Sequence, residues 1–168
     1  MKSRLRFSRG VTLIEMMTTV VIVGIVAGMA MPRFQTAWER IKIRSTSRDI
    51  VSTLRLARSM ALTDKSQFGV HFDPDVRCLT LFKDLVNPTG GSFEVGDSVV
   101  RIDTLPFEFI YLGTDMTNDA LVFRPNGSSS FQGGGNIWAM AYSEAAAGFL
   151  SYNVLASTGR VHSYAHFY

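Results

Sequence analysis

The stretch SRGVTLIEMMTTVVIVGIVAGMAMP, from Ser8 to Pro32, decides how this chain is organised. Residues 11–31 form a run of 21 residues in which Glu15 is the only charged residue. As a helix with a rise of 1.5 Å per residue, this run spans about 31 Å, which is enough to cross the hydrocarbon core of a bilayer. A charged side chain inside a bilayer costs about 2.5–3.5 kcal/mol, so the presence of Glu15 needs an explanation.

The segment before the apolar run is basic. Lys2, Arg4, Arg6 and Arg9 occur there without an acidic residue, which favours a cytoplasmic N-terminus. A secretory signal peptide is one interpretation, with cleavage at 28–30 releasing a soluble protein that begins at Met31. However, the apolar run is longer than the 7–15 residues of an ordinary signal peptide, and it contains an acid.

The helical pattern also continues beyond the apolar run. Apolar residues recur at helical spacing as far as residue 61. The pattern predicts one long helix from about Thr12 to Leu62, with a first half in lipid and an amphipathic second half that packs on other elements. Pro32 is expected to kink this helix, because proline removes a backbone hydrogen bond and clashes with the preceding turn. The recurring residues are Phe34, Trp38, Ile41, Ile50, Leu54, Ala57 and Ala61.

From Gln67 onward the pattern alternates, with turn residues between short apolar segments. It predicts a mainly antiparallel β domain after one long helix, which is an α+β arrangement. The expected strands are 68–72, 76–83, 98–103, 107–112, 120–124, 137–142, 149–156 and 160–164.

The length of 168 residues fits one globular domain with an N-terminal appendage. The net charge of +3 is unevenly distributed: residues 33–65 hold eight Lys/Arg and three Asp/Glu, whereas residues 66–168 hold five and ten. The single cysteine, Cys78, excludes an internal disulfide and a Cys-rich zinc site.

The border between the basic and apolar segments carries a specific motif. Arg9-Gly10-Val11-Thr12-Leu13-Ile14-Glu15 resembles the type IV prepilin processing site, with Val11 in place of the common Phe. The resemblance implies cleavage by a membrane prepilin peptidase between Gly10 and Val11, followed by methylation of the new Val11 amine. It also implies four parts: a leader at 1–10, a transmembrane helix half at 11–32, an amphipathic half at 33–65 and a periplasmic β-rich domain at 66–168.

This processing suggests a role for Glu15. A cut after Gly10 creates an α-amino cation at Val11, and in a filament the Glu15 carboxylate of one subunit can meet the amine of another. A buried charge is tolerable when it is paired and costly when it is alone, so Glu15 would set the register of assembly. The alternative is that Glu15 only reaches the lipid headgroups near the helix start.

A second resemblance covers the rest of the chain. Leu56–Ala61, Val122–Gly127, the 133–135 glycine loop and Asn153–Val161 are similar to motifs of the GspH/FimT family of pilin-like proteins. Met60 stands where that family has an acid. The resemblance implies the pilin-like fold, a long helix packed on a mainly antiparallel sheet. Pro125, Gly127 and Gly159 suit turns, so these motifs are interpreted as structural.

Catalytic patterns are weak. His162 and His166 are four residues apart on an expected strand, and His71 is distant in sequence, so no metal site is predicted. Gly127-Ser128-Ser129-Ser130 lacks the second glycine and the strand-to-helix context of a nucleophile elbow. The glycine loop leads into a strand rather than a helix, which does not fit a phosphate cradle. We therefore expect neither an enzyme nor a cofactor.

Three functions follow from the resemblances. The favoured one is a minor pseudopilin of a type II secretion system, and the first alternative is a minor pilin of a type IV pilus. The second alternative is DNA capture through Arg160 and His162, which the acidic composition of residues 66–168 disfavours. The expected partners are other pilins or pseudopilins and the prepilin peptidase/methyltransferase, with nucleic acid not expected. The expected location is the bacterial inner membrane, crossed once, with a cytoplasmic N-terminus and a periplasmic C-terminal domain.

Overall fold

The first element of the fold is a single long helix. The computed structural model describes residues 10–87, 90–130, 135–143 and 146–168. Helix α1 (Leu13–Asp64) has 52 residues, which confirms the long helix expected from the sequence. The chain divides into two compact units, Met1–Trp38 and Glu39–Tyr168, so α1 contributes residues to both units.

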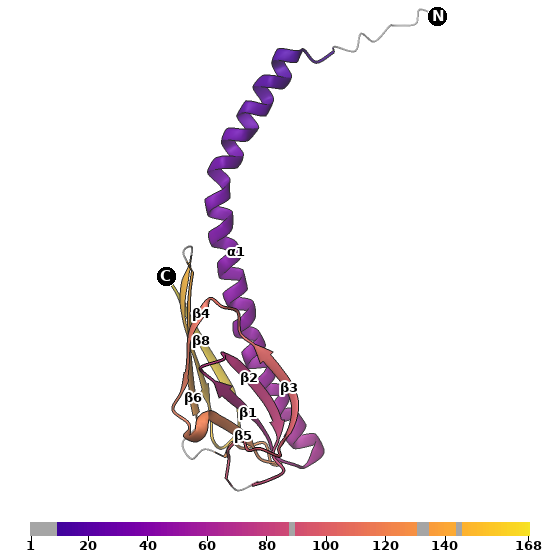
Figure 1. Ribbon diagram of the computed structural model, residues 1–168, viewed down its shortest axis with the longest axis vertical. Helices are drawn as coiled ribbons and strands as arrows, with labels where there is room; N and C mark the ends of the chain where they lie inside the picture. The colour runs from indigo at the N-terminus through magenta and orange to yellow at the C-terminus, as the bar shows by residue number, and fades with distance from the viewer. Residues whose placement is uncertain (1–9, 88–89, 131–134, 144–145) are drawn as a thin grey trace, which may run out of the picture. The chain divides into compact units, whose positions relative to one another are not determined.

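The second unit adds two antiparallel sheets to the C-terminal part of α1 (Figure 1). In the described residues each sheet has four strands, in the orders β3-β2-β1-β5 and β4-β6-β7-β8. This arrangement confirms the α+β class. The elements are β1 (Phe68–Asp73), β2 (Cys78–Lys83), β3 (Ser98–Thr104), β4 (Phe109–Thr114), the short 3-10 helix η1 (Thr117–Asp119), β5 (Ala120–Phe123), β6 (Gly135–Tyr142), β7 (Ala147–Val154) and β8 (Val161–Phe167).

Strand β2 begins two residues later than the alternating pattern predicts. The Asp73 carboxylate accepts the backbone N–H groups of Asp75 and Val76, both at 3.0 Å. Arg77 then has a positive φ of 55°. An aspartate that binds the backbone two and three residues later holds a turn, so Val76 belongs to the turn and not to the strand.

Strands β4 and β8 also differ from their expected bounds. The Phe109 N–H donates to the Pro106 carbonyl at 3.0 Å, and this turn delays the start of β4. Strand β8 runs to Phe167, three residues further than expected, because it continues to pair with β7 as far as Gly148. Pairing with a neighbouring strand therefore extends the ladder beyond the local apolar alternation.

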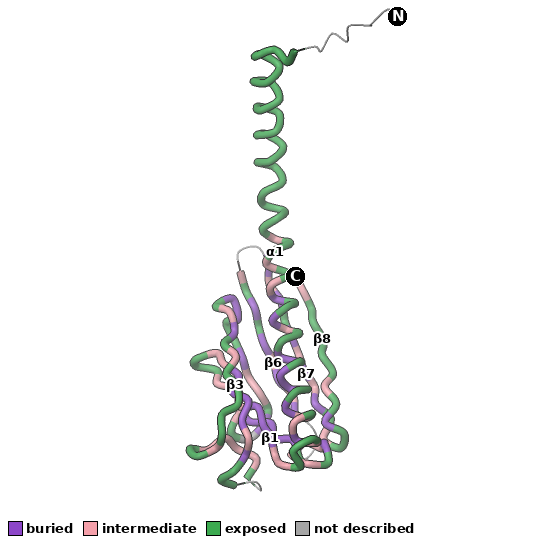
Figure 2. The backbone as a smooth tube through the Cα atoms, turned by 90° about the vertical axis from the view of Figure 1, so that its right-hand side faces the viewer, coloured by how far each residue is buried: buried purple, intermediate pink, exposed green. Residues whose placement is uncertain are grey.

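One face of α1 is buried in the second unit. Ile50, Leu54, Ala57 and Ala61, which the helical spacing placed on one face, are at most 1% exposed. They share one core cluster with residues of both sheets, among them Leu81 and Leu150. Figure 2 shows buried positions along the part of α1 that lies beside the strands. Burying a Leu or Ile side chain contributes about 1.5–3 kcal/mol, so this contact stabilises the unit.

Most of β3 and β8, one edge strand of each sheet, lies outside this core. Every residue of β3 except Asp103 is exposed, as are the five central residues of β8. Both strands lie at the end of their sheet, where one row of backbone groups has no strand partner in the described part of the chain. Such edges are available for contacts with other chains.

A buried tyrosine links α1 to the second sheet. Tyr152 on β7 is fully buried, and its hydroxyl bonds the Ser47 hydroxyl of α1 at 3.0 Å. Burial raises the pKa of Tyr152 to about 12, although the hydrogen bond to Ser47 lowers it. The neutral phenol is therefore strongly favoured in the folded protein.

We expect this shift to make the protein less stable at alkaline pH. Unfolded Tyr152 loses its proton near pH 10, whereas the folded form keeps it until about pH 12. Its contribution is thus complete below pH 10, and up to about 2–3 kcal/mol is lost as the pH rises through 12. Urea unfolding of the wild type and Tyr152→Phe between neutral and alkaline pH tests this. At pH 7 the free energy of unfolding of Tyr152→Phe should be about 1 kcal/mol lower than that of the wild type. Above pH 10 it should decline less steeply with pH, and parallel plots of unfolding free energy against pH would contradict the prediction.

Candidate functional site

The start of α1 is closed by a side-chain cap. The Thr12 hydroxyl accepts the Glu15 N–H at 3.3 Å, and the Thr12 carbonyl accepts the Met16 N–H at 3.2 Å. Thr12 is therefore the N-cap, and Glu15 occupies the third helical position of the capping-box pattern T-x-x-E. The sequence interpretation of Glu15 missed this local role, although the spacing of Thr12 and Glu15 signals it.

The other polar side chains near the start of α1 are satisfied within the helix. The Thr18 and Thr19 hydroxyls donate to the carbonyls of Ile14 and Met16, both at 2.8 Å. Threonines that bond back to the preceding turn carry no unmet hydrogen-bond donor into lipid. The Glu15 carboxylate differs, since it has no hydrogen-bonding or ionic partner in the described part of this chain. Within the described residues, this carboxylate is therefore left without a compensating charge.

The residues around the expected cleavage point are accessible. Gly10 and Val11 precede α1 and are exposed, and a Cβ added at Gly10 would meet no atom within 4 Å. The expected leader lies outside the described residues apart from Gly10. By length and composition, α1 could cross a membrane. Cleavage between Gly10 and Val11 and methylation of Val11 stay predictions.

Pro32 lies inside α1, and the helix continues through it without interruption. The Thr36 hydroxyl donates to the Pro32 carbonyl at 3.2 Å. The rings of Phe34 and Trp38 stack one turn later, with centroids 6.5 Å apart. Exposed aromatic rings just after an apolar span are typical of the membrane interface. The kink expected at Pro32 stays a prediction.

Three motifs that are far apart in the sequence meet at one point of the second unit. The Arg58 Nε donates to the Gly127 carbonyl at 3.2 Å. Gly159 lies so close that a Cβ there would be 2.3 Å from the same carbonyl oxygen. Gly127 and Gly159 have φ values of 82° and 62°, which favour glycine. Arg58 thus ties α1 to the turn after β5 and to the β7–β8 turn, a role that the sequence interpretation missed.

A charged pair joins α1 to the loop before β4. The Lys42 ammonium donates to the Glu108 carboxylate, which is only 3% exposed. Burial raises the pKa of Glu108, but the hydrogen bond and charge of Lys42, with a backbone donor, outweigh it and hold that pKa below its usual value. The hydrogen bond to Glu108 in turn raises the pKa of Lys42. Both groups are therefore ionised at neutral pH, and the pair fixes the loop to the helix.

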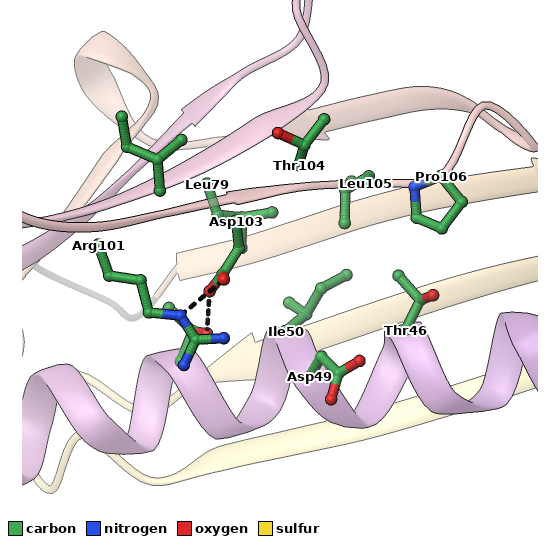
Figure 3. Close-up of a pocket in the computed structure, with 11 residues that line it drawn as sticks. Thr46, Asp49, Ile50, Leu79, Arg101, Asp103, Thr104, Leu105 and Pro106 are labelled. Carbon is green, nitrogen blue, oxygen red and sulfur yellow. Dashed lines mark hydrogen bonds and ion pairs between the residues drawn. The ribbon is translucent and has the colours of Figure 1, made fainter.

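A cleft of about 250 Å³ lies between α1 and β3 (Figure 3). Its main charged groups neutralise each other: Arg101 Nε bonds one Asp103 oxygen at 2.6 Å, and Thr53 donates to the other at 2.9 Å. No histidine or cysteine lines the cleft in the described residues. We also find no group of three or more His, Cys, Asp or Glu in the described chain that could hold a metal ion.

The candidate DNA contacts lie at the edge of the second sheet. Arg160 is exposed in the turn before β8, and His162 is exposed on β8. His166 lies edge-to-face with Tyr168, with centroids 4.8 Å apart, whereas His71, on β1 of the first sheet, stacks against Phe93. The structure therefore does not bring the three histidines together. Arg160 and His162 are accessible but present a single fixed positive charge.

We expect no measurable DNA binding through the Arg160–His162 edge, because affinity rises with the number of phosphates neutralised and one arginine neutralises few. A gel-shift titration of the purified protein with a DNA duplex at low salt tests this. A shift that Arg160→Ala weakens, while Arg124→Ala leaves it unchanged, would contradict the prediction. Arg124 is a suitable control because it is also exposed on this unit.

The first comparison with known proteins concerns the N-terminal stretch. Residues 5–31 match the model of the prokaryotic N-terminal methylation motif. This match includes Gly10, Val11 and Glu15. Together with the fold, it defines the class: the chain is type IV pilin-like, with an apolar N-terminal helix that continues into a β-rich domain.

The structural neighbours are minor filament subunits. The minor pseudopilin EpsH from the type 2 secretion system of Vibrio cholerae superposes with a TM-score of 0.53 and 17% identity, over 73% of this chain and 95% of that one. The type IV minor pilin FimU of Pseudomonas aeruginosa gives a TM-score of 0.57 and 15% identity, over 74% and 89%. At these identities the likeness concerns the fold. No curated protein sequence matches this chain.

These findings support a pilin-like structural role and indicate no catalytic family. The motif and the fold imply processing by a prepilin peptidase and assembly with other pilins. They also fit a membrane-anchored protein with a soluble C-terminal domain. The pilin-like fold, which the motifs around Arg58, Gly127 and Gly159 implied, is confirmed.

Proposed function

We propose that this chain is a minor pseudopilin, a structural subunit of a type II secretion pseudopilus that takes part in protein export across the outer membrane. The observation that carries the proposal is the methylation motif at residues 5–31 at the head of a fold shared with EpsH. Neither feature alone is as specific, because the motif marks many filament subunits and the fold is shared at low identity.

In this proposal the peptidase cuts after Gly10, and the Val11 amine is methylated. Residues 11–32 then anchor the protein in the inner membrane, with the N-terminus in the cytoplasm and the β-rich domain in the periplasm. During assembly the Glu15 carboxylate pairs with the Val11 amine of a neighbouring subunit. The lack of a partner for Glu15 in the described part of the monomer supports this step, because a lone buried charge is costly and a paired one is tolerated.

The alternative is a minor pilin of a type IV pilus. The observation that favours it is the similarity to FimU, which is at least as good by TM-score as the similarity to EpsH. The same processing and the same role of Glu15 would apply. The two functions differ only in the machine that the subunit serves.

Deletion of the gene should separate the two machines. We expect loss of secretion of folded proteins through the outer membrane, with twitching motility and DNA uptake unchanged. The three phenotypes should be measured in parallel, with complementation by the wild-type gene as the control. Loss of twitching with normal secretion would instead assign the chain to a type IV pilus.

A further inference from the structure

The exposed side of α1 in the second unit carries a concentrated positive charge. Arg40, Arg44, Arg48 and Arg55 are all exposed there, and we call these four residues the arginine face. Their spacings of four, four and seven residues place them within an arc of about 80°, since each helical residue turns by about 100°. The face is therefore a continuous strip along the helix.

The arginine face has no carboxylate partner within the described part of the chain. The ion pairs there are Lys42 with Glu108 and Arg101 with Asp103. Arg44 contacts the Phe167 ring at 4.9 Å, which leaves its charge unneutralised. The helix acids Glu39 and Asp49 point about 135° or more away from the centre of the face. Like charges one turn apart repel each other, so the monomer tolerates an unfavourable arrangement.

The side chains beside the face would allow a close approach. Ser45 and Ser52 are exposed, and they are small. The apolar face of this part of α1, with Ile50 and Leu54, is already buried against the sheets. An amphipathic helix that lies in a membrane interface inserts through an exposed apolar face. The arginine face thus suits a polar protein surface better than a lipid surface.

We propose that the arginine face docks onto an acidic surface on the globular domain of a neighbouring pilin-like subunit. This inference rests on the proposed function, because it assumes that the chain assembles into a filament. The planar guanidinium group matches carboxylates through paired hydrogen bonds, which gives both strength and orientation. A β-rich domain of this type can carry an excess of acids, since residues 66–168 of this chain hold ten Asp/Glu and five Lys/Arg.

The test is a double charge reversal, Arg48→Glu with Arg55→Glu, in the full processed chain. Neither side chain makes a hydrogen bond or ion pair within the described chain, so folding should be unaffected. Co-purification with filament partners should fall at least about tenfold at low salt, because like charges would face each other. Wild-type co-purification should weaken at high salt. The neutral double variant, Arg48→Gln with Arg55→Gln, should lose less co-purification than the charge reversal. It removes the positive charges without introducing repulsion, so it is the control for a folding defect caused by the two glutamates.

The matched control reverses two exposed arginines outside the face, Arg124→Glu with Arg160→Glu, for the same change in net charge. It should co-purify like the wild type. All variants should also be reconstituted with partners in nanodiscs of zwitterionic lipid only. A loss that persists there supports the proposal, whereas one that requires anionic lipid would make the membrane the partner and overturn it. If the arginine-face variants co-purify with partners as well as the wild type does, the docking inference is wrong but the proposed function stands. If the wild type associates with no pilin-like subunit, the proposed function is wrong as well.

Discussion

Glu15→Ala is expected to reduce incorporation of the processed protein into filaments by about a hundredfold or more, while cleavage and membrane insertion continue. Removing one member of a buried charge pair typically costs about 3–5 kcal/mol, and each 1.4 kcal/mol is a factor of ten. The variant monomer should be held at least as firmly in lipid, because the substitution removes an acidic side chain whose transfer into lipid is unfavourable. Crosslinking or co-purification with filament partners, wild type against variant, measures the effect.

A second substitution at the same position separates pairing from capping. Glu15 lies at the third position of the helix, where its N–H bonds the Thr12 hydroxyl. Glu15→Gln retains that backbone bond and a side chain suited to a capping box, but it removes the charge. If the charge pairs with the Val11 amine, the Glu15→Gln variant should fail in assembly as the Glu15→Ala variant does. Normal assembly of the Glu15→Gln variant alone would assign Glu15 to capping, and normal assembly of both variants would mean that it only reaches the headgroups.

Gly10→Leu is expected to block processing almost completely. The resemblance to the prepilin site makes Gly10 the residue before the cut, so a side chain there would meet the peptidase. Within the described chain there is room for it, because no atom lies within 4 Å of an added Cβ. The uncut precursor would retain residues 1–10 and have no free amine at Val11. The amine that the carboxylate of a neighbouring subunit would meet is then missing, so assembly should fail as in Glu15→Ala.

Intact mass of the protein purified from membranes measures this. The wild type should lack residues 1–10 and carry one added methyl group, whereas the Gly10→Leu protein should retain the leader. Gly24→Ala and Gly28→Ala are matched controls, because these glycines are also free of neighbours within 4 Å but lie beyond the site. Both should be processed normally. A wild-type N-terminus at Met31 would contradict the pilin-like interpretation and indicate a secreted soluble protein.

Local patterns in the sequence predicted the helix and the strands well. Ile50, Leu54, Ala57 and Ala61 repeat at helical spacing, and all four are buried on one face of α1. The alternating segments predicted the eight strands, although the bounds of β2, β4, β6, β7 and β8 differ from the expected ones by two or three residues. Such patterns are readable because they depend on neighbours along the chain. The capping role of Thr12 is also a local feature, because the T-x-x-E spacing of Thr12 and Glu15 indicates it.

The sequence by itself determined the N-terminal motif, the long apolar helix and the succession of short strands, since each depends on residues within a few positions of one another. The tertiary structure alone decided the partition into two sheets, the burial of Glu108 beside Lys42 and the meeting of Arg58 with the glycine turns. Arg58 and Gly127 are 69 residues apart, and Lys42 and Glu108 are 66 apart. No local periodicity encodes such contacts, because they form only when the whole chain closes around one core and the cost of ordering it has been offset.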